Sequence, residues 1–230
     1  MPSKNIIAIL PAAGTGTRLG DARPKQYLEV AGRPMIAHGI DVLSQVSRIS
    51  RIVVVLSAED AHWQSLMAGQ RRAETLPLGG ATRGETVRNA LRELAGQCTP
   101  DTWMLVHDAA RPCIRVSLIE QFLDELEHDP VGGLLALPSA DTLKSADASQ
   151  RVARTLPREH VWRAQTPQMF RLRDLLPALE SMPDATDEAQ AIEARGLQPK
   201  LVLGDSVNIK VTYAPDLALA EMLLLRKGAP

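Results

Sequence analysis

Continuous apolar runs alternate along this chain with segments in which apolar residues recur every three or four positions, the spacing of a helix face. The runs predict buried strands at Ile6–Leu10, Arg51–Ser57, Trp103–Val106, Gly132–Leu137 and Leu201–Leu203, and a further strand at Asn208–Val211. The helical spacing predicts helices at Ile36–Val46, from about Gly84 to Leu94, from a Ser117 N-cap to Leu126, from Asp187 to Ala194, and from Pro215 onward. This order predicts an α/β fold, a mainly parallel sheet with helices on both faces.

The segment from about residue 141 to 167 interrupts the alternation. Asp141–Ala146 and Arg151–Leu156 have the composition of two short strands that pair across a polar turn. This hairpin has too few apolar residues for a core of its own, and an isolated hairpin is only marginally stable in water. We therefore expect a single domain over residues 1–230, with 139–160 as a β-arm that leans on that domain or on another subunit.

Composition narrows the function classes. With 230 residues, 45% of them hydrophobic and 23% charged, the chain is typical of a globular protein with a substantial core. A net charge of −1 disfavours nucleic acid or an anionic membrane as the main partner, and 3% aromatic residues disfavour a base-stacking surface. Cys98 and Cys113 fit neither a zinc site nor a disulfide framework, so we expect inert thiols in a cytoplasmic protein. The apolar run before Pro11 is too short for a signal peptide, and no run approaches the length of a membrane span.

The loop after the first predicted strand has the composition of a phosphate-binding turn. It reads Pro11-Ala-Ala-Gly-Thr-Gly-Thr-Arg-Leu-Gly20, and Pro24-Lys25 follow. Glycine and alanine let the backbone turn tightly, approach a ligand closely and present N–H groups to it. Arg18 and Lys25 add positive charges beside these donors, so the loop is predicted to hold a phosphate chain. A plain glycine turn with solvated surface charges is the alternative.

Two common phosphate loops do not match this sequence. A P-loop requires Lys-Ser or Lys-Thr directly after its last glycine, whereas Thr17-Arg18 follow Gly16. In a Rossmann fingerprint two residues separate the second glycine from the third, whereas Gly20 comes one position too late after Gly16. Neither a Walker-type ATPase nor an NAD-dependent enzyme is indicated.

A second group of candidate residues follows the strand Trp103–Val106. His107-Asp108 does not indicate a catalytic triad, because no serine or cysteine lies on a nucleophile elbow and neighbouring strand residues point to opposite faces. Asp108 is better interpreted as a ligand for a sugar hydroxyl or for Mg²⁺. Arg111 is either a phosphate clamp or a partner in a surface salt bridge.

Later in the chain, Thr142, Lys144, Arg158 and Thr166 lie on the irregular segment. They form either the solvated face of the hairpin or part of a functional site. Lys210 alternates with apolar neighbours, so its side chain points away from theirs. It either lines the cleft at the carboxyl ends of the strands or faces water.

The chain as a whole resembles the 2-C-methyl-D-erythritol 4-phosphate cytidylyltransferases of the non-mevalonate isoprenoid pathway. Eight motifs carry the resemblance in order: Pro11-Ala-Ala-Gly-x-Gly-x-Arg18, Pro24-Lys-Gln-Tyr27, Gly79-Gly80, Val106-His-Asp-Ala-Ala-Arg-Pro112, Asp141-Thr-x-Lys144, Thr166-Pro-Gln168, Thr186-Asp-Glu-Ala189 and Asn208-Ile-Lys-Val-Thr212. The resemblance implies a Rossmann-like nucleotidyltransferase fold. It also implies that CTP and a polyol phosphate react, with Mg²⁺ as cofactor, to give a CDP-polyol and pyrophosphate.

The resemblance further implies roles for individual residues. Arg18 and Lys25 would stabilise the charged transition state, and Arg158 and Lys210 would hold the acceptor phosphate for in-line attack. The nucleotide-binding residues that it implies are Pro11, Ala12, Ala13, Gly14, Gly16, Gly80, Ala81 and Thr86. The polyol-binding residues that it implies are Asp108, Ala109, Arg111, Thr142 and Thr166. The family also builds a homodimer in which the β-arm crosses to the other subunit.

One position departs from the family pattern. Ala81 stands where relatives carry an acidic residue after the paired glycines, and Thr86 stands where serine is common. An acid there could accept a hydrogen bond from the cytosine amino group, so recognition of the base falls to backbone carbonyls of the turn. Two alternatives remain beside this activity: a ribitol-5-phosphate cytidylyltransferase on the same scaffold, and a nucleotide-binding regulator that has lost catalysis.

Overall fold

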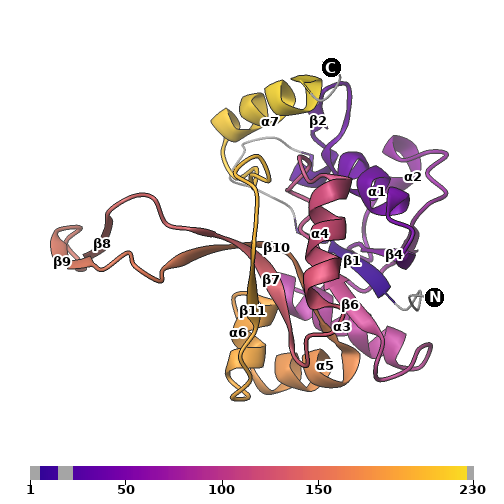
Figure 1. Ribbon diagram of the computed structural model, residues 1–230. Coiled ribbons are helices and arrows are strands. Elements are labelled where there is room, and N and C mark those ends of the chain that lie inside the picture. The colour runs from indigo at the N-terminus through magenta and orange to yellow at the C-terminus, as the bar shows by residue number, and fades with distance from the viewer. Residues whose placement is uncertain (1–5, 15–22, 227–230) are drawn as a thin grey trace.

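A seven-stranded sheet forms the centre of the molecule (Figure 1). The structure is a computed structural model that describes residues 6–14 and 23–226. The sheet contains β1 (Ile6–Pro11), β4 (Ile49–Val55), β5 (Glu74–Leu76), β6 (Trp103–Val106), β7 (Gly132–Pro138), β10 (Trp162–Arg171) and β11 (Lys200–Leu203). Their order is β11-β7-β10-β6-β1-β4-β5, and every pairing is parallel except those of β10 with β6 and β7. The predicted mainly parallel sheet is confirmed.

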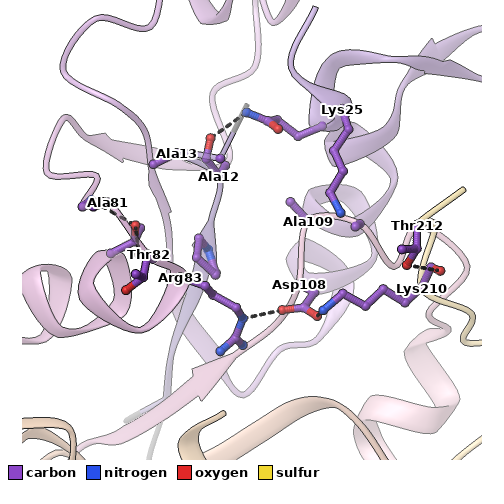
Figure 2. A pocket seen from close by; sticks show the side chains of 16 residues that line it. Ala12, Ala13, Lys25, Ala81, Thr82, Arg83, Asp108, Ala109, Lys210 and Thr212 are labelled. Carbon is purple, nitrogen blue, oxygen red and sulfur yellow. Dashed lines mark hydrogen bonds and ion pairs between the residues drawn. The ribbon is translucent and has the colours of Figure 1, made fainter. Parts of the chain in front are cut away.

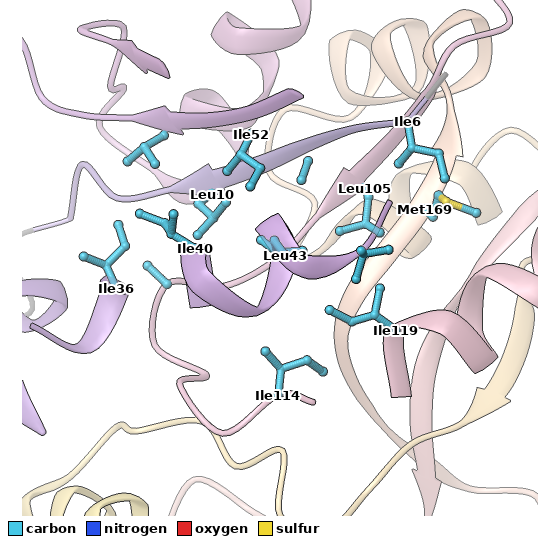
Figure 3. Packing of buried hydrophobic residues seen from close by; sticks show 14 of the residues in the cluster. Ile6, Leu10, Ile36, Ile40, Leu43, Ile52, Leu105, Ile114, Ile119 and Met169 are labelled. Atoms are coloured by element: carbon cyan, nitrogen blue, oxygen red, sulfur yellow. The ribbon is translucent and has the colours of Figure 1, made fainter. Parts of the chain in front are cut away.

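Helices cover both faces of this sheet. They are α1 (Met35–Gln45), α2 (Trp63–Leu66), α3 (Arg83–Ala95), α4 (Val116–Leu126), α5 (Leu172–Ser181), α6 (Glu188–Glu193) and α7 (Ala214–Arg226). Alternate residues of β1 divide between two cores. Ala8 and Leu10 belong to the core under α1 and α4, shown in Figure 3, whereas Ile7 and Ile9 belong to the core under α3, α5 and α6. The predicted α/β fold is therefore confirmed on both faces.

Smaller elements complete the body of the molecule. A short 3₁₀ helix, η2 (Lys25–Tyr27), precedes the two-stranded pair β2 (Glu29–Val30) and β3 (Arg33–Pro34). Helix α7 packs against β2 at the far end of the chain. Within residues 6–14 and 23–226, no helix has the length and apolar character needed to span a membrane.

The predicted hairpin is present as an arm. Strands β8 (Leu143–Ala146) and β9 (Val152–Leu156) pair antiparallel and project away from the sheet (Figure 1). Neither strand has a fully buried residue, and Val152 is 65% exposed. Because hydrophobic stabilisation scales with buried apolar area, the arm gains little of it from its own chain.

Strand β10 and helix α5 are absent from the sequence prediction. Polar residues interrupt the apolar pattern of β10, yet Gln165, Thr166 and Gln168 are all buried. Protein groups replace water around them. Gln168 donates from Nε2 to Asp187 at 3.0 Å and accepts at Oε1 from the N–H of Ala189 at 2.8 Å. Pattern reading therefore fails here because hydrogen bonding, rather than apolar character, allows these residues to be buried.

Two further predicted elements are wrong in detail. Helix α4 begins at Val116 after Arg115, and the N–H of Ile119 donates to the Arg115 carbonyl, so Ser117 is not its N-cap. The segment Asn208–Val211 is not a strand of the sheet. It lies instead against the loop after β6, where the N–H of Val211 donates to the carbonyl of Ala110 at 2.8 Å.

A buried chain of hydrogen bonds joins β10 to the end of β6. The hydroxyl oxygen of Thr166 accepts from the N–H of Asp108 at 3.0 Å and lies 3.1 Å from Nδ1 of His107. Nε2 of His107 lies 3.3 Å from the carbonyl oxygen of Arg111. One assignment of protons satisfies every group: Nε2–H donates to Arg111, and the Thr166 hydroxyl donates to Nδ1. Burial lowers the pKa of His107 to about 4, so the ring is neutral near pH 7.

We expect His107 to make the fold less stable as the pH falls. Its pKa is about 4 in the folded chain and near the ordinary 6.5 when unfolded, so the unfolded chain binds more protons between these values. From about pH 6.5 down to pH 5, this group should lower the free energy of unfolding by up to roughly 1.4 kcal/mol per pH unit. Urea unfolding at pH 7, 6 and 5 measures the slope.

His107→Gln is the control for this prediction, because the amide keeps hydrogen-bonding groups but does not titrate. The slope between pH 6.5 and 5 should become flatter in this variant. Carboxylates whose pKa is lowered in the fold, such as Asp108, lose their contribution to stability mainly below pH 5. They therefore affect the two slopes little between pH 6.5 and 5. An identical slope in both proteins would contradict the assignment.

Candidate active site

A pocket of about 670 Å³ opens at the carboxyl ends of β1 and β6 (Figure 2). Ligands of open α/β sheets bind at this edge, because the loops that leave parallel strands converge there. Three loops and one later segment form its walls. The residues that line it are Pro11, Ala12, Ala13, Gly14, Lys25, Gln26, Gly80, Ala81, Thr82, Arg83, Thr86, Asp108, Ala109, Ala110, Lys210 and Thr212.

Backbone groups form one wall of the pocket, after β1. The N–H of Ala12 donates to the carbonyl of Val55 at 2.8 Å, and buried Gln26 donates from Nε2 to the carbonyl of Ala12 at 2.7 Å. The neighbouring turn approaches so closely that a Cβ on Gly79 would lie 2.3 Å from Cβ of Ala13. Only glycine allows this approach, so the two loops are held together as one surface.

Side chains of α3 hold the turn that precedes it. The hydroxyl of Thr86 accepts from the N–H of Gly80 at 3.0 Å and donates to the carbonyl of Thr82 at 2.9 Å. The Glu85 carboxylate accepts from the N–H of Ala81 at 2.8 Å. The N–H groups of Gly80 and Ala81 are thus both bonded to side chains. Thr82 caps the helix by accepting from the N–H of Glu85, and the spacing Thr82-x-x-Glu85 is a sequence signal for such a cap that the sequence prediction did not use.

The opposite wall carries charged groups around Asp108, which is 6% exposed. Nε of Arg83 lies 2.7 Å from Oδ1 of Asp108, and Nζ of Lys210 lies 2.8 Å from Oδ2 (Figure 2). Nε of Arg111 lies 3.9 Å from the same Oδ2. Burial alone would raise the pKa of Asp108, but Arg83 and Lys210 outweigh it and hold the pKa far below its ordinary value.

Lys25 adds positive charge to the same region. It begins η2, lines the pocket and donates from Nζ to the carbonyl of Val211 at 3.4 Å. This contact joins the loop after β1 to the segment that carries Lys210. The pocket therefore has a backbone wall on one side and a cationic wall on the other, an arrangement that suits a ligand with several phosphates.

Two predicted polyol-binding residues lie behind the pocket wall rather than on it. Arg111 is 8% exposed and donates from Nη1 to the carbonyl of Asn208 at 2.7 Å, which excludes a surface salt bridge. Burial lowers its pKa, while neighbouring Asp108 opposes that shift. Thr166 is 4% exposed, and its hydroxyl is hydrogen-bonded to the N–H of Asp108 and to Nδ1 of His107. Both residues hold the loop that carries Asp108.

The predicted residues of the arm lie away from the pocket. Thr142 and Arg158 are exposed at the base of the arm, and neither lines the pocket of this subunit. Arg158 donates from Nη1 to the carbonyl of Ala140, and Lys144 donates from Nζ to the hydroxyl of Thr155 at 2.7 Å. Arg18 and Gly16 lie outside the described residues.

The charged wall includes a pair that sequence reasoning missed. Arg83 reaches both Asp108 and Glu188, although Glu188 is 105 residues away in the chain. Glu188 belongs to one of the motifs quoted above, but the sequence suggests only a helix start for it. Pairing over this distance depends on the topology of the sheet, so no local pattern predicts it.

No group of three or more His, Cys, Asp or Glu side chains in residues 6–14 and 23–226 is arranged to hold a metal ion. Among the residues that the structure describes, Asp108 is the acidic residue that lines the pocket, and each of its oxygens already has a cationic partner. A resident divalent ion would have to displace Arg83 or Lys210. The protein groups therefore fit a built-in magnesium site poorly.

Comparisons with known proteins agree with the motifs. The family model for 2-C-methyl-D-erythritol 4-phosphate cytidylyltransferase matches residues 6–226. Over 219 residues, the chain is 54% identical to the protein of that name from Dechloromonas aromatica, covering 94% of this chain and 96% of that one. Over 227 residues, it is 52% identical to the one from Nitrosospira multiformis, covering 96% and 98%.

Solved structures show the same likeness. A crystal structure of 4-diphosphocytidyl-2C-methyl-D-erythritol synthase matches with a TM-score of 0.85 and 34% identity, over 95% of this chain and 98% of that one. The 2-C-methyl-D-erythritol 4-phosphate cytidylyltransferase of Francisella tularensis matches with a TM-score of 0.82 and 31% identity, over 95% and 99%. The resemblance inferred from the motifs is confirmed in both sequence and fold.

Proposed function

The chain belongs to the 2-C-methyl-D-erythritol 4-phosphate cytidylyltransferase family. From that premise we propose which part of its pocket binds the nucleotide and which part binds the acceptor. The enzyme transfers a cytidylyl group from CTP to 2-C-methyl-D-erythritol 4-phosphate, giving 4-diphosphocytidyl-2-C-methyl-D-erythritol and pyrophosphate. The names of the relatives agree with this acceptor rather than ribitol 5-phosphate, and with an enzyme rather than a regulator.

The two unlike walls of the pocket support this division. The nucleotide lies along Pro11–Gly14 and the turn Gly80–Thr86, where backbone groups and small side chains leave room for it. The acceptor lies at the cationic wall beside Asp108 and Lys210. Lys25 stands between the two, where the phosphates of both substrates meet.

The reaction requires positive charge more than a general base. An oxygen of the acceptor phosphate attacks the α-phosphorus of CTP and forms the new P–O bond. The bond from that phosphorus to the bridging oxygen breaks, and pyrophosphate leaves with the electron pair. Because the acceptor phosphate is already an anion, no proton has to be removed, and neutral His107 has no part in the step. Lys25 and Arg18 stabilise the charge that builds on the phosphate oxygens, while Lys210 and Arg158 hold the acceptor.

Magnesium enters this scheme as part of the nucleotide substrate. The pocket's carboxylate is paired with Arg83 and Lys210, so the described chain offers no set of metal ligands. Mg²⁺ usually keeps several waters and is held by one or two carboxylates together with substrate phosphates. Because the pocket carboxylate is already paired, we assign the ion to the phosphates of CTP. No step assigned to the residues of this chain passes through the ion.

The base of CTP lies at the turn Gly80–Thr86. Thr86 and Glu85 already accept from the N–H groups of Gly80 and Ala81. At Gly80 and Ala81 the N–H groups are therefore engaged, and we assign recognition of the base to the carbonyl oxygens of these two residues. Carbonyls accept from the 4-amino group of cytosine but have nothing to accept from the 4-oxygen of uracil. This arrangement favours CTP although position 81 lacks an acidic side chain.

The arm supports a homodimer with shared active sites. Its strands have no buried residue in this subunit, which leaves the hairpin available to pack on a partner, and an isolated hairpin is only marginally stable. Arg158 is exposed at its base, outside the pocket of its own subunit. In the proposed dimer it reaches Lys25 and Lys210 of the other subunit. Each chain 1–230 works as one domain with residues 139–160 as the arm.

The enzyme works in the cytoplasm on small-molecule substrates. Neither Cys98 nor Cys113 is part of a disulfide in the structure. Free thiols are typical of a reducing compartment. Neither nucleic acid nor a membrane is a partner, in keeping with the net charge of −1.

Release of pyrophosphate from CTP tests the activity and the cationic wall together. Wild-type enzyme should turn over with 2-C-methyl-D-erythritol 4-phosphate and far more slowly with ribitol 5-phosphate. Lys25→Ala should lower kcat by roughly 10²–10³, the usual loss when one transition-state donor is removed. Lys200→Ala is a matched control, because Lys200 pairs with Glu125 on the surface and should leave kcat unchanged. A loss below about threefold in Lys25→Ala would reassign this lysine to structure.

Nucleotide competition tests the recognition of the base. The value of kcat/KM for CTP should exceed that for UTP by about 10- to 100-fold, the usual range for a misplaced hydrogen-bonding group. Thr86→Val removes the hydroxyl that holds the turn and should reduce this ratio, whereas Thr86→Ser keeps the hydroxyl and the ratio. Equal values for CTP and UTP in the wild type would refute the assignment.

Mixed dimers test the shared site. Lys25→Ala and Arg158→Ala should each be nearly inactive, yet a dimer with one chain of each kind has both defects in one site and none in the other. Random mixing by co-expression makes about half the dimers mixed, so roughly a quarter of wild-type activity should return.

A mixture of Lys25→Ala with Lys210→Ala is the matched control for the shared site. These two residues belong to the same chain's site, so every site of a mixed dimer keeps one defect and no activity returns. If mixed dimers of Lys25→Ala and Arg158→Ala form without recovery, Arg158 acts within its own chain.

A further inference from the structure

Arg83, the first residue of α3, joins two carboxylates at the edge of the pocket. Its Nε donates to Oδ1 of Asp108 at 2.7 Å, and Figure 2 shows the guanidinium directed at that carboxylate. Its Nη1 and Nη2 donate to Oε1 and Oε2 of Glu188 at 2.7 and 3.0 Å. No role assigned above uses the side chain of Arg83 or of Glu188.

Glu188 fixes the orientation of Arg83. Glu188 is the first residue of α6 and is completely buried. Asp187 caps this helix, because its side chain accepts from the N–H of Gln190. A buried carboxylate that loses its cation is strongly destabilising, so the pair is held together. The two parallel hydrogen bonds also set the plane of the guanidinium, as a single lysine contact could not. The third nitrogen, Nε, is thereby aimed at Asp108.

Arg83 in turn limits how strongly Asp108 holds Lys210. One carboxylate oxygen pairs with Arg83 and the other with Lys210, so the charge of Asp108 is divided between two cations. Without Arg83, the carboxylate could turn and direct both oxygens at Lys210. The lysine would then have to break a stronger ion pair before it could bind a phosphate.

We propose that Arg83 and Glu188 are positioning residues for the acceptor phosphate. By holding one oxygen of Asp108, they let Lys210 pass from that carboxylate to the phosphate when the acceptor binds. The inference rests on the proposed role of Lys210 as a ligand of the acceptor phosphate. It extends the site from the pocket wall, where Arg83 lies, to Glu188 on α6, which is completely buried and does not line the pocket.

The test separates the Michaelis constants of the two substrates. Arg83→Lys keeps the charge but cannot bond both carboxylates as a fork. Its KM for 2-C-methyl-D-erythritol 4-phosphate should rise about tenfold, while its KM for CTP should change less than about twofold. Arg92→Lys is the matched control, because Arg92 lies on the same helix and makes one exposed pair with Glu180 at 2.9 Å. Both constants should stay at wild-type values in that variant.

A double-mutant cycle asks whether Arg83 acts through Asp108. In the background of Asp108→Asn, adding Arg83→Lys should change the acceptor KM by less than about twofold, because the carboxylate that it positions is already gone. A further tenfold rise would show that Arg83 acts on the substrate directly and would overturn the proposal. So would an equal rise of both KM values in the single variant, or no change in either.

The remaining outcomes are also decisive. If Arg83→Lys does not fold, the double variant Arg83→Gln with Glu188→Gln removes both charges together and should show the same selective rise. A selective rise supports the proposal, and wild-type constants overturn it. If Lys210→Ala leaves the acceptor KM unchanged, the proposed role of Lys210 fails first. If wild-type enzyme does not turn over, the fault lies with the activity rather than with Arg83.

Discussion

The carboxylate of Asp108 is the group on which the arrangement of the pocket depends. It is almost completely buried, and a buried charge is tolerated only when it is paired and hydrogen-bonded. Arg83 from the start of α3 and Lys210 from the late loop supply the pairs, and Arg111 lies close behind. Three segments far apart in the chain are therefore fixed against one another by a single side chain. The positive charge that remains around it is what a phosphate would meet.

The antiparallel strand β10 connects this group to the rest of the fold. Its buried polar residues bond to neighbouring segments instead of to water. Thr166 accepts from the backbone N–H of Asp108. Gln168 bonds to Asp187 and Ala189 and so fixes the first turn of α6, which begins at Glu188. Gln165 donates to the carbonyl of Asp205, just before the segment that carries Lys210. The residues that interrupt the strand pattern are thus the ones that place the charged wall.

The two walls of the pocket are built by different means. The nucleotide wall depends on close approach of backbone, and Gly79 is its clearest requirement, since any side chain there would meet Ala13. The acceptor wall depends on long charged side chains held by other charged groups. Rigid backbone suits a ligand that is recognised by shape, whereas a lysine paired with a carboxylate can exchange that partner for an anionic ligand, as the proposed role of Lys210 requires.

The sequence by itself determined most of the strands and helices, although not β10 and α5, and it identified the members of the pocket that follow strands. The apolar run of β1 and the helical spacing of α3 reflect which residues of each segment are buried, and a local stretch of sequence is enough to show this. Lys25 and Asp108 stand beside glycine-rich or strand-end motifs, so they could be named in advance. Lys210 could be named as well, although it lies on a loop rather than on the strand that its apolar neighbours suggested.

Only the tertiary structure decided which groups pair and which way they face. Arg83 and Glu188 meet because α3 and α6 cover the same face of the sheet, although 105 residues separate them. Arg111 and Thr166 stand in motifs beside the pocket residues, yet they turn inward to hold the loop of Asp108. Local patterns report the burial of each residue but not its partner. Buried polar groups must find specific partners, and the order and direction of the strands determine which partners are within reach.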